Sequence, residues 1–244
     1  MYENRYDDPE FFDKYAQMGR SQQGLAGAGE WETLRALLPD FTNRRVLDLG
    51  CGYGWHCIYA MEHGARSAVG VDLSEKMLAV ARDKTPYEAV QYVRLPMEEI
   101  DFAADRFDVA LSSLALHYVA DFAAVARRVN ACLAPGGDFV FSCEHPVFTA
   151  QGPQDWVRDG QGRILHFPVD DYFYEGARDA VFLGEHVRKY HRTLTTYLDG
   201  LLTNGFAITR VVEPMPPAHM MAIPGMKDEM RRPMMLIVAA KKTA

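Results

Sequence analysis

The chain places the sequence Val-Leu-Asp-Leu-Gly-Cys-Gly-Tyr-Gly at residues 46–54, and the sequence Val-Gly-Val-Asp follows at residues 69–72. A short apolar segment leads into a glycine-rich loop, a helical pattern follows, and a second apolar segment ends at a carboxylate. This order is typical of a doubly wound α/β sheet that binds a nucleoside-containing ligand beyond the carboxyl ends of its strands. The pattern therefore predicts both the fold class and the edge of the sheet where a ligand binds.

Strands and helices alternate on both sides of this motif. Short apolar runs predict strands at 46–49, 68–71, 90–94, 107–111, 138–143, 206–212 and 234–240. Five prolines before the last strand argue against a long crossover helix there, because proline breaks helices. Without such a helix the last strand should pair antiparallel with its neighbour. We expect a seven-stranded, Rossmann-like, mostly parallel sheet with an antiparallel last strand. The Pro-Gly-Gly sequence at residues 135–137 is expected to end a helix and turn the chain into the fifth strand.

Two segments fall outside this rhythm, and we predict that both cover the ligand edge within a single domain of residues 1–244. Residues 1–40 contain a short helix, a glycine-bearing segment expected to be a mobile lid, and a helix that packs on the sheet. Residues 144–191 are rich in aromatic side chains and have little helical periodicity, so we expect an inserted cap with short antiparallel strands. An aromatic cap is typical of an enclosed site for a small organic molecule, and equally of a subunit interface in a homodimer.

Composition excludes several classes of function. The formal net charge is −7 and the basic residues are scattered, which argues against nucleic acid as a partner. No apolar run approaches the ~20 residues that span a bilayer, so we expect no membrane partner. The four cysteines form neither a zinc pair nor a disulfide framework, and the histidines lack ligand spacing. We therefore expect a cytoplasmic protein without a metal site.

The glycine loop also bears on the kind of nucleoside. Its glycines have the spacing G-x-G-x-G, and Trp55 and His56 stand where a dinucleotide loop carries its third glycine. This replacement fits a ligand without phosphates. Asp72, at the end of the second strand, can accept both hydroxyl hydrogens of a ribose. The alternative is a structural turn with Asp72 as a helix cap, an interpretation that the loop and the acid together disfavour.

Five segments carry a resemblance to a known family, at residues 46–54, 69–74, 95–98, 107–119 and 133–141. Together they resemble the class I S-adenosylmethionine-dependent methyltransferases, in the small-molecule subgroup similar to methyltransferase type 11. The resemblance is close over about residues 40–145. It implies S-adenosylmethionine as cofactor, S-adenosylhomocysteine as product, and transfer of a methyl group to a small-molecule acceptor by in-line displacement.

The resemblance also implies roles for residues of the loop. Gly50, Cys51 and Gly52 would let the backbone pass close to the methionine part and the ribose. Asp72 would bind the ribose hydroxyls. Asp48 would orient the loop and help to hold the cofactor's amino group. As a carboxylate within an apolar strand, Asp48 must also be hydrogen-bonded.

Further residues are assigned to the adenine in the same way. Leu73 and Met77 would pack on one face of the base and Met97 on the other, while Glu98 or the backbone beside it would read the base edge. The alternative for the two methionines is that they are core residues.

The remaining candidates lie near the reacting end. Ser113 and His117 would lie near the cofactor sulfur, and Arg20 would pair with the methionine carboxylate, as arginine suits planar carboxylates. His117 and His145 are the candidate catalytic bases. A structural histidine and a solvated surface arginine are the alternatives for His117 and Arg20.

Two other functions compete with methyl transfer. A nicotinamide-dependent oxidoreductase would use the same sheet, although the loop lacks its third glycine and no Tyr-x-x-x-Lys sequence is evident. A non-catalytic cofactor-binding protein of the same fold is the third candidate, because methyl transfer requires no fixed catalytic pair.

Overall fold

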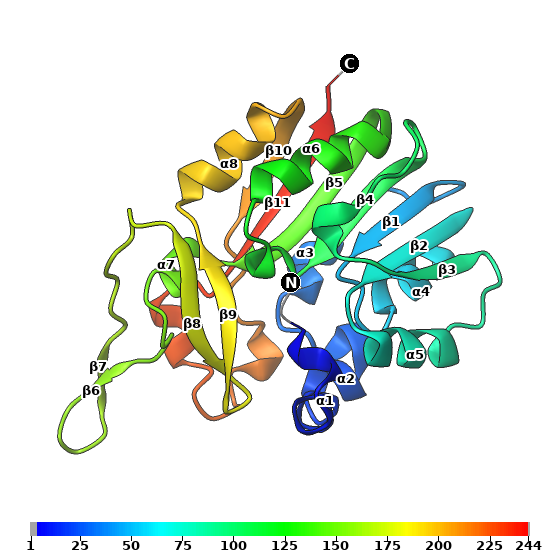
Figure 1. The fold of residues 1–244 in the computed structure, drawn as a ribbon. Coiled ribbons are helices and arrows are strands. Elements are labelled where there is room, and N and C mark those ends of the chain that lie inside the picture. The colour runs from blue at the N-terminus through cyan, green and yellow to red at the C-terminus, as the bar shows by residue number, and fades with distance from the viewer. Residues whose placement is uncertain (1–3, 244) are drawn as a thin grey trace.

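A computed structural model describes residues 4–243 and has one large twisted sheet at its centre (Figure 1). The strand order is β10-β11-β5-β4-β1-β2-β3. The strands are β1 (Arg45–Leu49), β2 (Ser67–Asp72), β3 (Val90–Arg94), β4 (Phe107–Ser113), β5 (Leu133–Glu144), β10 (Phe206–Val212) and β11 (Met235–Lys242). Strands β1 to β5 run parallel, whereas β11 lies antiparallel between β5 and β10. The predicted seven-stranded sheet with an antiparallel last strand is confirmed.

Helices cover both faces of the sheet. Helices α6 (Phe122–Cys132) and α8 (Leu194–Leu202) pack side by side on one face, and α3 (Trp31–Arg35) and α4 (Trp55–Glu62) pack on the other (Figure 1). Helix α5 (Glu75–Lys84) lies against β2 and β3. This arrangement leaves the carboxyl ends of the parallel strands as the edge that is open to other segments.

The fifth strand begins earlier than predicted. Helix α6 ends at Cys132 and β5 starts at Leu133, so the Pro-Gly-Gly sequence lies inside the strand. The pairing register with β4 shifts from Leu133 to Asp138, which marks a bulge at this point. The prediction that Pro-Gly-Gly turns the chain before the strand was therefore wrong, because a bulge absorbs proline and glycine without ending the pairing.

The N-terminal segment consists of short helical pieces instead of one helix and a loose lid. They are the 3-10 helix η1 (Arg5–Asp7), α1 (Pro9–Ala16), α2 (Gly19–Gln22) and the 3-10 helix η2 (Gly24–Gly27). Asp8 caps α1 by accepting from the amide of Phe11. The predicted helix before β1 is also shorter than expected, since α3 ends at Arg35, well before the proline at residue 39.

The segment after β5 forms two small hairpins, as the predicted antiparallel cap requires. Short helix α7 (Pro146–Thr149) leads to β6 (Val157–Arg158) and β7 (Ile164–His166), which extend away from the sheet (Figure 1). The longer hairpin pairs β8 (Gly176–Phe182) with β9 (Glu185–His191) and lies beside the carboxyl edge of the sheet. In the proline-rich linker before β11 the described helices are two 3-10 helices, η5 (Ala218–Met220) and η6 (Asp228–Arg231). No helix within residues 4–243 is long and apolar enough to cross a membrane.

Candidate active site

A cavity of about 630 Å³ lies at the carboxyl edge of the parallel strands. We divide its walls into two halves. The loop half comprises the loop after β1, the end of β2 and the 3-10 helix η3 (Met97–Glu99) that follows β3. The hairpin half comprises the end of β5, the inner face of the β8–β9 hairpin, and Arg5 and Tyr6 of the N-terminal segment. Segments far apart in the sequence therefore enclose one space.

Asp72 and the glycine loop are held in a fixed relation in the loop half. One carboxylate oxygen of Asp72 accepts from the amide of Gly52 at 2.9 Å, and the other accepts from the amide of Ser74 at 2.8 Å. Burial raises the pKa of Asp72. Helix α5 is capped by the hydroxyl of Ser74, which accepts from Met77, so Asp72 is not the cap. Its carboxylate has lone pairs left for a ligand.

Two glycines of the loop after β1 have backbone conformations that place the loop at the cavity. Gly50 has a φ of +69°, and a Cβ there would lie 2.3 Å from the Cβ of Ala115. Gly52 has a φ of +51°, and a Cβ there would meet nothing within 4 Å. The backbone at Gly52 therefore borders open space on the cavity side, while Gly50 is required for close packing against the segment after β4.

Asp48 lies beneath the loop and does not line the cavity. Its side chain is fully buried, and one oxygen lies 3.8 Å from the thiol of Cys57 and 4.0 Å from Nδ1 of His56. The other oxygen has no hydrogen-bond partner in the described structure. Burial raises the pKa of Asp48 to about 7. The expected hydrogen bond is present on one oxygen, although among residues 4–243 its donor is the weak thiol of Cys57.

Apolar side chains complete the loop half. Met77 from α5 is 2% exposed, and Met97 begins the 3-10 helix after β3. Both line the cavity with Leu73 and Leu95, and Glu98 lines it beside Met97. Burial raises the pKa of Glu98. The loop half thus combines the carboxylate of Asp72, which backbone amides hold in place, with a group of apolar side chains.

The N-terminal segment forms a roof with polar links to both halves. The hydroxyls of Tyr6 and Tyr118 lie 3.1 Å apart. Asp7 accepts from the hydroxyl of Ser74 at 2.6 Å. Arg20 lines the cavity and forms an ion pair at 2.5 Å with Glu30, which is 2% exposed. The guanidinium of Arg20 is therefore oriented by a buried acid.

A family model described as a methyltransferase domain matches residues 47–141. A solved structure of an S-adenosylmethionine-dependent methyltransferase from Mesorhizobium loti is 47% identical and superposes with a TM-score of 0.83; the alignment covers 90% of this chain and all of that one. The chain belongs to the S-adenosylmethionine-dependent methyltransferases.

Two more proteins extend the comparison of this methyltransferase. A solved protein from Listeria monocytogenes is 53% identical, with a TM-score of 0.87 over 91% of this chain and all of that one. An N-demethylindolmycin N-methyltransferase from Streptomyces griseus is 28% identical over 71% of this chain and 74% of its own. The cofactor of the methyltransferase is S-adenosylmethionine.

The cavity brings together eleven of the residues predicted to bind the cofactor. They are Arg20, Gly50, Cys51, Gly52, Asp72, Leu73, Met77, Met97, Glu98, Ser113 and His117. Asp48, the twelfth, lies under the loop as described above.

The candidate base His145 does not line the cavity, and neither do His191 and Arg192 nearby. Nδ1 of His145 accepts from the amide of Val147 and so caps α7, and its Nε2 lies 2.8 Å from Glu213. His191, just before α8, hydrogen-bonds to Thr149 and to the carbonyl of Tyr172. Arg192 is buried, and its guanidinium donates to the carbonyls of Leu116 and Val119. Arg192 therefore stabilises the segment after β4 from the side away from the cavity.

His117 of the methyltransferase is hydrogen-bonded through one ring nitrogen and lies near an acid with the other. Nδ1 accepts from the backbone amide of Glu144 at 3.3 Å, and Nε2 lies 3.9 Å from the carboxylate of Glu144. Burial lowers the pKa of His117 to about 4, so the ring is neutral near pH 7. In this state Nε2 carries the proton and Nδ1 is occupied, which leaves no free acceptor on the ring.

A buried polar cluster in the hairpin half was largely missed from the sequence. Nζ of Lys189 lies 2.5 Å from Oε1 of Glu144 and 2.9 Å from the amide oxygen of Gln154. The amide nitrogen of Gln154 donates to Oε2 of Glu144 at 2.7 Å. A usable signal was the two-residue alternation in β9, where Val187, Lys189 and His191 share the buried face.

Proposed function

We propose that this methyltransferase transfers the methyl group of S-adenosylmethionine to a small-molecule acceptor by in-line displacement. The observation that carries the proposal is the single cavity that runs from Asp72 to Lys189, because its volume lies in the range typical of small-molecule sites. The likeness to an enzyme named for N-methylation of demethylindolmycin, a small molecule, supports the same class of acceptor.

The residues of the loop half fit the cofactor. Asp72 would accept from the ribose hydroxyls, and Met77 and Met97 would enclose the adenine. The open space beside Gly52 accommodates the ribose and methionine parts, and Arg20, oriented by Glu30, would bind the carboxylate. The unpartnered oxygen of Asp48 lies below the glycine loop. Asp48 would orient this loop and help to hold the amino group of the cofactor.

When bound, the cofactor supplies an electrophilic methyl group on a sulfonium. The protein's own contribution is therefore chiefly to position the acceptor and to exclude water, and positioning alone lowers a barrier by about 7–11 kcal/mol. Tyr6 and Tyr118, whose hydroxyls lie 3.1 Å apart, would help to exclude solvent from the bound cofactor. His117, neutral and with Nδ1 already accepting from the amide of Glu144, would hold the end of β5 and donate from Nε2 instead of acting as a base.

The test begins with cofactor binding. Calorimetric titration should show that S-adenosylmethionine binds and that NAD does not. Asp72→Ala should weaken S-adenosylmethionine binding by about 1.5–3 kcal/mol, the range for hydrogen bonds to a charged group. Circular dichroism should show the same fold in the variant, since an unfolded protein would also lose binding.

Methyl transfer is then assayed against a library of metabolites, with S-adenosylhomocysteine release as the readout. Binding of NAD in place of S-adenosylmethionine would contradict the proposal. Cofactor binding with no turnover on any acceptor would favour a non-catalytic role.

A further inference from the structure

Lys189 occupies an unusual position for a lysine. It lies on β9 of the inserted hairpin, is 3% exposed, and lines the cavity that also holds the glycine loop. Lysines are almost never fully buried unless they are paired. The pairing is present, since Glu144 and Gln154 both accept from its ammonium group.

The pairing leaves one donor of Lys189 unused. An ammonium carries three N–H donors, and among residues 4–243 two acceptors are found for it. The ring of Phe182, which also lines the cavity, has its centroid 5.4 Å from Nζ. The cation is thus held by two partners from β5 and the cap, next to an aromatic wall of the cavity.

Glu144 acts as the anchor of this cation. Burial raises the pKa of its carboxyl, but His117, the positive charge of Lys189 and the hydrogen bonds from Lys189 and Gln154 outweigh this and hold the pKa below its ordinary value. Both of its oxygens are engaged, one by Lys189 and the other by Gln154. Glu144 is therefore a charged acceptor that is already satisfied, and Lys189 is the member of the pair with a donor to spare.

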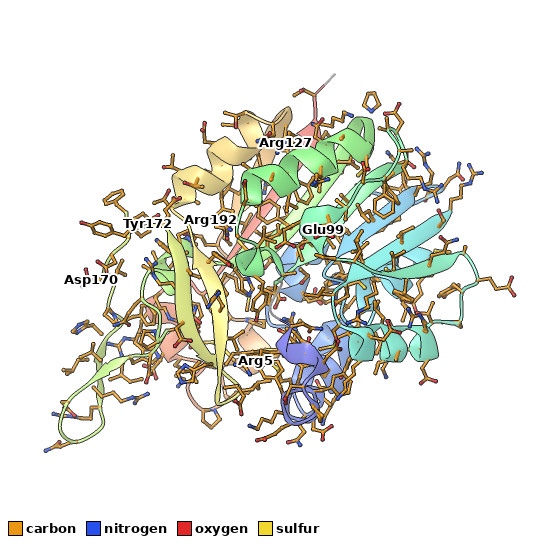
Figure 2. All side chains as sticks on the ribbon, in the orientation of Figure 1. Arg5, Glu99, Arg127, Asp170, Tyr172 and Arg192 are labelled. Carbon is orange, nitrogen blue, oxygen red and sulfur yellow. The ribbon has the colours of Figure 1, made fainter. Side chains whose placement is uncertain are left out.

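The formal charges around this point favour an anion. Three basic residues, Arg5, Arg188 and Lys189, and one acidic residue, Glu144, line the hairpin half; Arg5 and Arg188 are exposed and have interactions of their own, so Lys189 is the buried cation of this wall. Figure 2 shows Arg5 between the N-terminal helices and the β8–β9 hairpin. A site with an excess of positive charge attracts acidic ligands. Because Glu144 lies against the same ammonium, a singly charged group is accommodated more readily than a dianion such as phosphate.

We propose that Lys189 binds a carboxylate of the acceptor, so that the methyltransferase acts on small organic acids. This inference rests on the proposed function, because it assumes that the hairpin half receives the acceptor. Lys189 would fix the acid group against the hairpin and thereby direct the rest of the acceptor toward the loop half.

The experiment uses full-length protein saturated with S-adenosylhomocysteine and four matched pairs of probes. They are benzoate and benzamide, 4-hydroxybenzoate and 4-hydroxybenzamide, indole-3-acetate and indole-3-acetamide, and hexanoate and hexanamide. Each is titrated by calorimetry. At least one acid should bind tenfold or more tightly than its amide. In Lys189→Met the preference should fall below twofold, while the dissociation constant of S-adenosylhomocysteine stays within twofold of the parent.

Two further variants keep the test interpretable. Lys227→Met removes an exposed lysine outside the cavity and should retain the acid preference. Lys189→Met leaves Glu144 buried without its cation, which can unfold the protein. The double variant Lys189→Met with Glu144→Gln removes both charges and should fold while still lacking the preference.

The outcomes separate the two proposals. Equal binding of acids and amides, or binding of neither, with S-adenosylhomocysteine bound, overturns the carboxylate inference alone. An acid preference that survives in the double variant also overturns it. Failure of S-adenosylhomocysteine to bind the parent protein overturns the proposed function instead.

Discussion

The loop half and the hairpin half of the cavity are built in different ways. The loop half takes its residues from consecutive strand ends between Gly50 and Glu98, and backbone amides hold the carboxylate of Asp72 in place. The hairpin half brings together Tyr6, Glu144 and Lys189, which lie far apart in the sequence, and side chains hold its charges. A wall fixed by backbone tolerates little change, whereas a wall fixed by side chains can be altered without moving the sheet.

The largest expected effect tests the rigidity of the loop half. Gly50→Val places a branched side chain where a Cβ already lies 2.3 Å from Ala115, at a φ of +69°. The loop must shift, so we expect S-adenosylhomocysteine affinity to fall at least 1,000-fold, or about 4 kcal/mol. Calorimetry measures this change. Gly160→Val, at an exposed glycine with open space around it, should bind normally; normal binding by both variants would refute the rigid wall.

The next prediction concerns the buried acid under the loop. Burial raises the pKa of Asp48 from its ordinary value of 3.8 to about 7 in the folded protein. The folded state therefore binds the proton more tightly than the unfolded state, and its contribution to stability is lost as the pH rises toward 7. Between pH 5 and pH 8 the parent should lose about 3 kcal/mol of unfolding free energy relative to Asp48→Asn.

Urea denaturation at several pH values provides the measurement. Asp83→Asn, at an exposed carboxylate on α5, is the control and should follow the parent at every pH. If the unfolding free energies of Asp48→Asn and the parent changed in parallel with pH, the pKa of Asp48 would not be raised in the folded protein.

The smallest effect is expected where the two halves meet. Tyr6→Phe removes the hydroxyl that lies 3.1 Å from Tyr118 while keeping the ring contacts with Phe11 and Tyr15. A neutral hydrogen bond contributes about 0.5–1.5 kcal/mol, so S-adenosylhomocysteine should dissociate roughly two- to tenfold faster. Stopped-flow fluorescence follows the release. Tyr87→Phe, outside the cavity, serves as the control, and an unchanged rate in Tyr6→Phe would show that this link does not hold the roof.

The same contrast explains what could be predicted from the sequence. The strand positions, the antiparallel last strand and the gathering of Gly50, Asp72 and Met97 depend on local patterns, such as a glycine loop after a strand or prolines that forbid a helix. Those patterns are read within a few residues. The pairing of Lys189 with Glu144 depends on how an insertion folds back over the sheet, and no local pattern specifies that packing.

The wrong and the incomplete expectations have similar causes. His145 was placed at the mouth of the cleft because it follows β5, but the turn at α7 uses its ring as a cap. For Asp48 the expected hydrogen bond is present but weak, because among residues 4–243 its donor is the thiol of Cys57, and the sequence does not specify which donor the packing brings to it. The Pro-Gly-Gly sequence has the composition of a turn, and only the pairing register reveals a bulge.

The N-terminal helix and the tip of the inserted hairpin touch each other directly. Phe11 lies against Phe182 with ring centroids 6.0 Å apart, and Lys14 of α1 bonds to Glu185 of β9 at 3.0 Å. The covers over the two ends of the cavity are therefore fastened together. A displacement of either cover therefore disturbs contacts that it shares with the other.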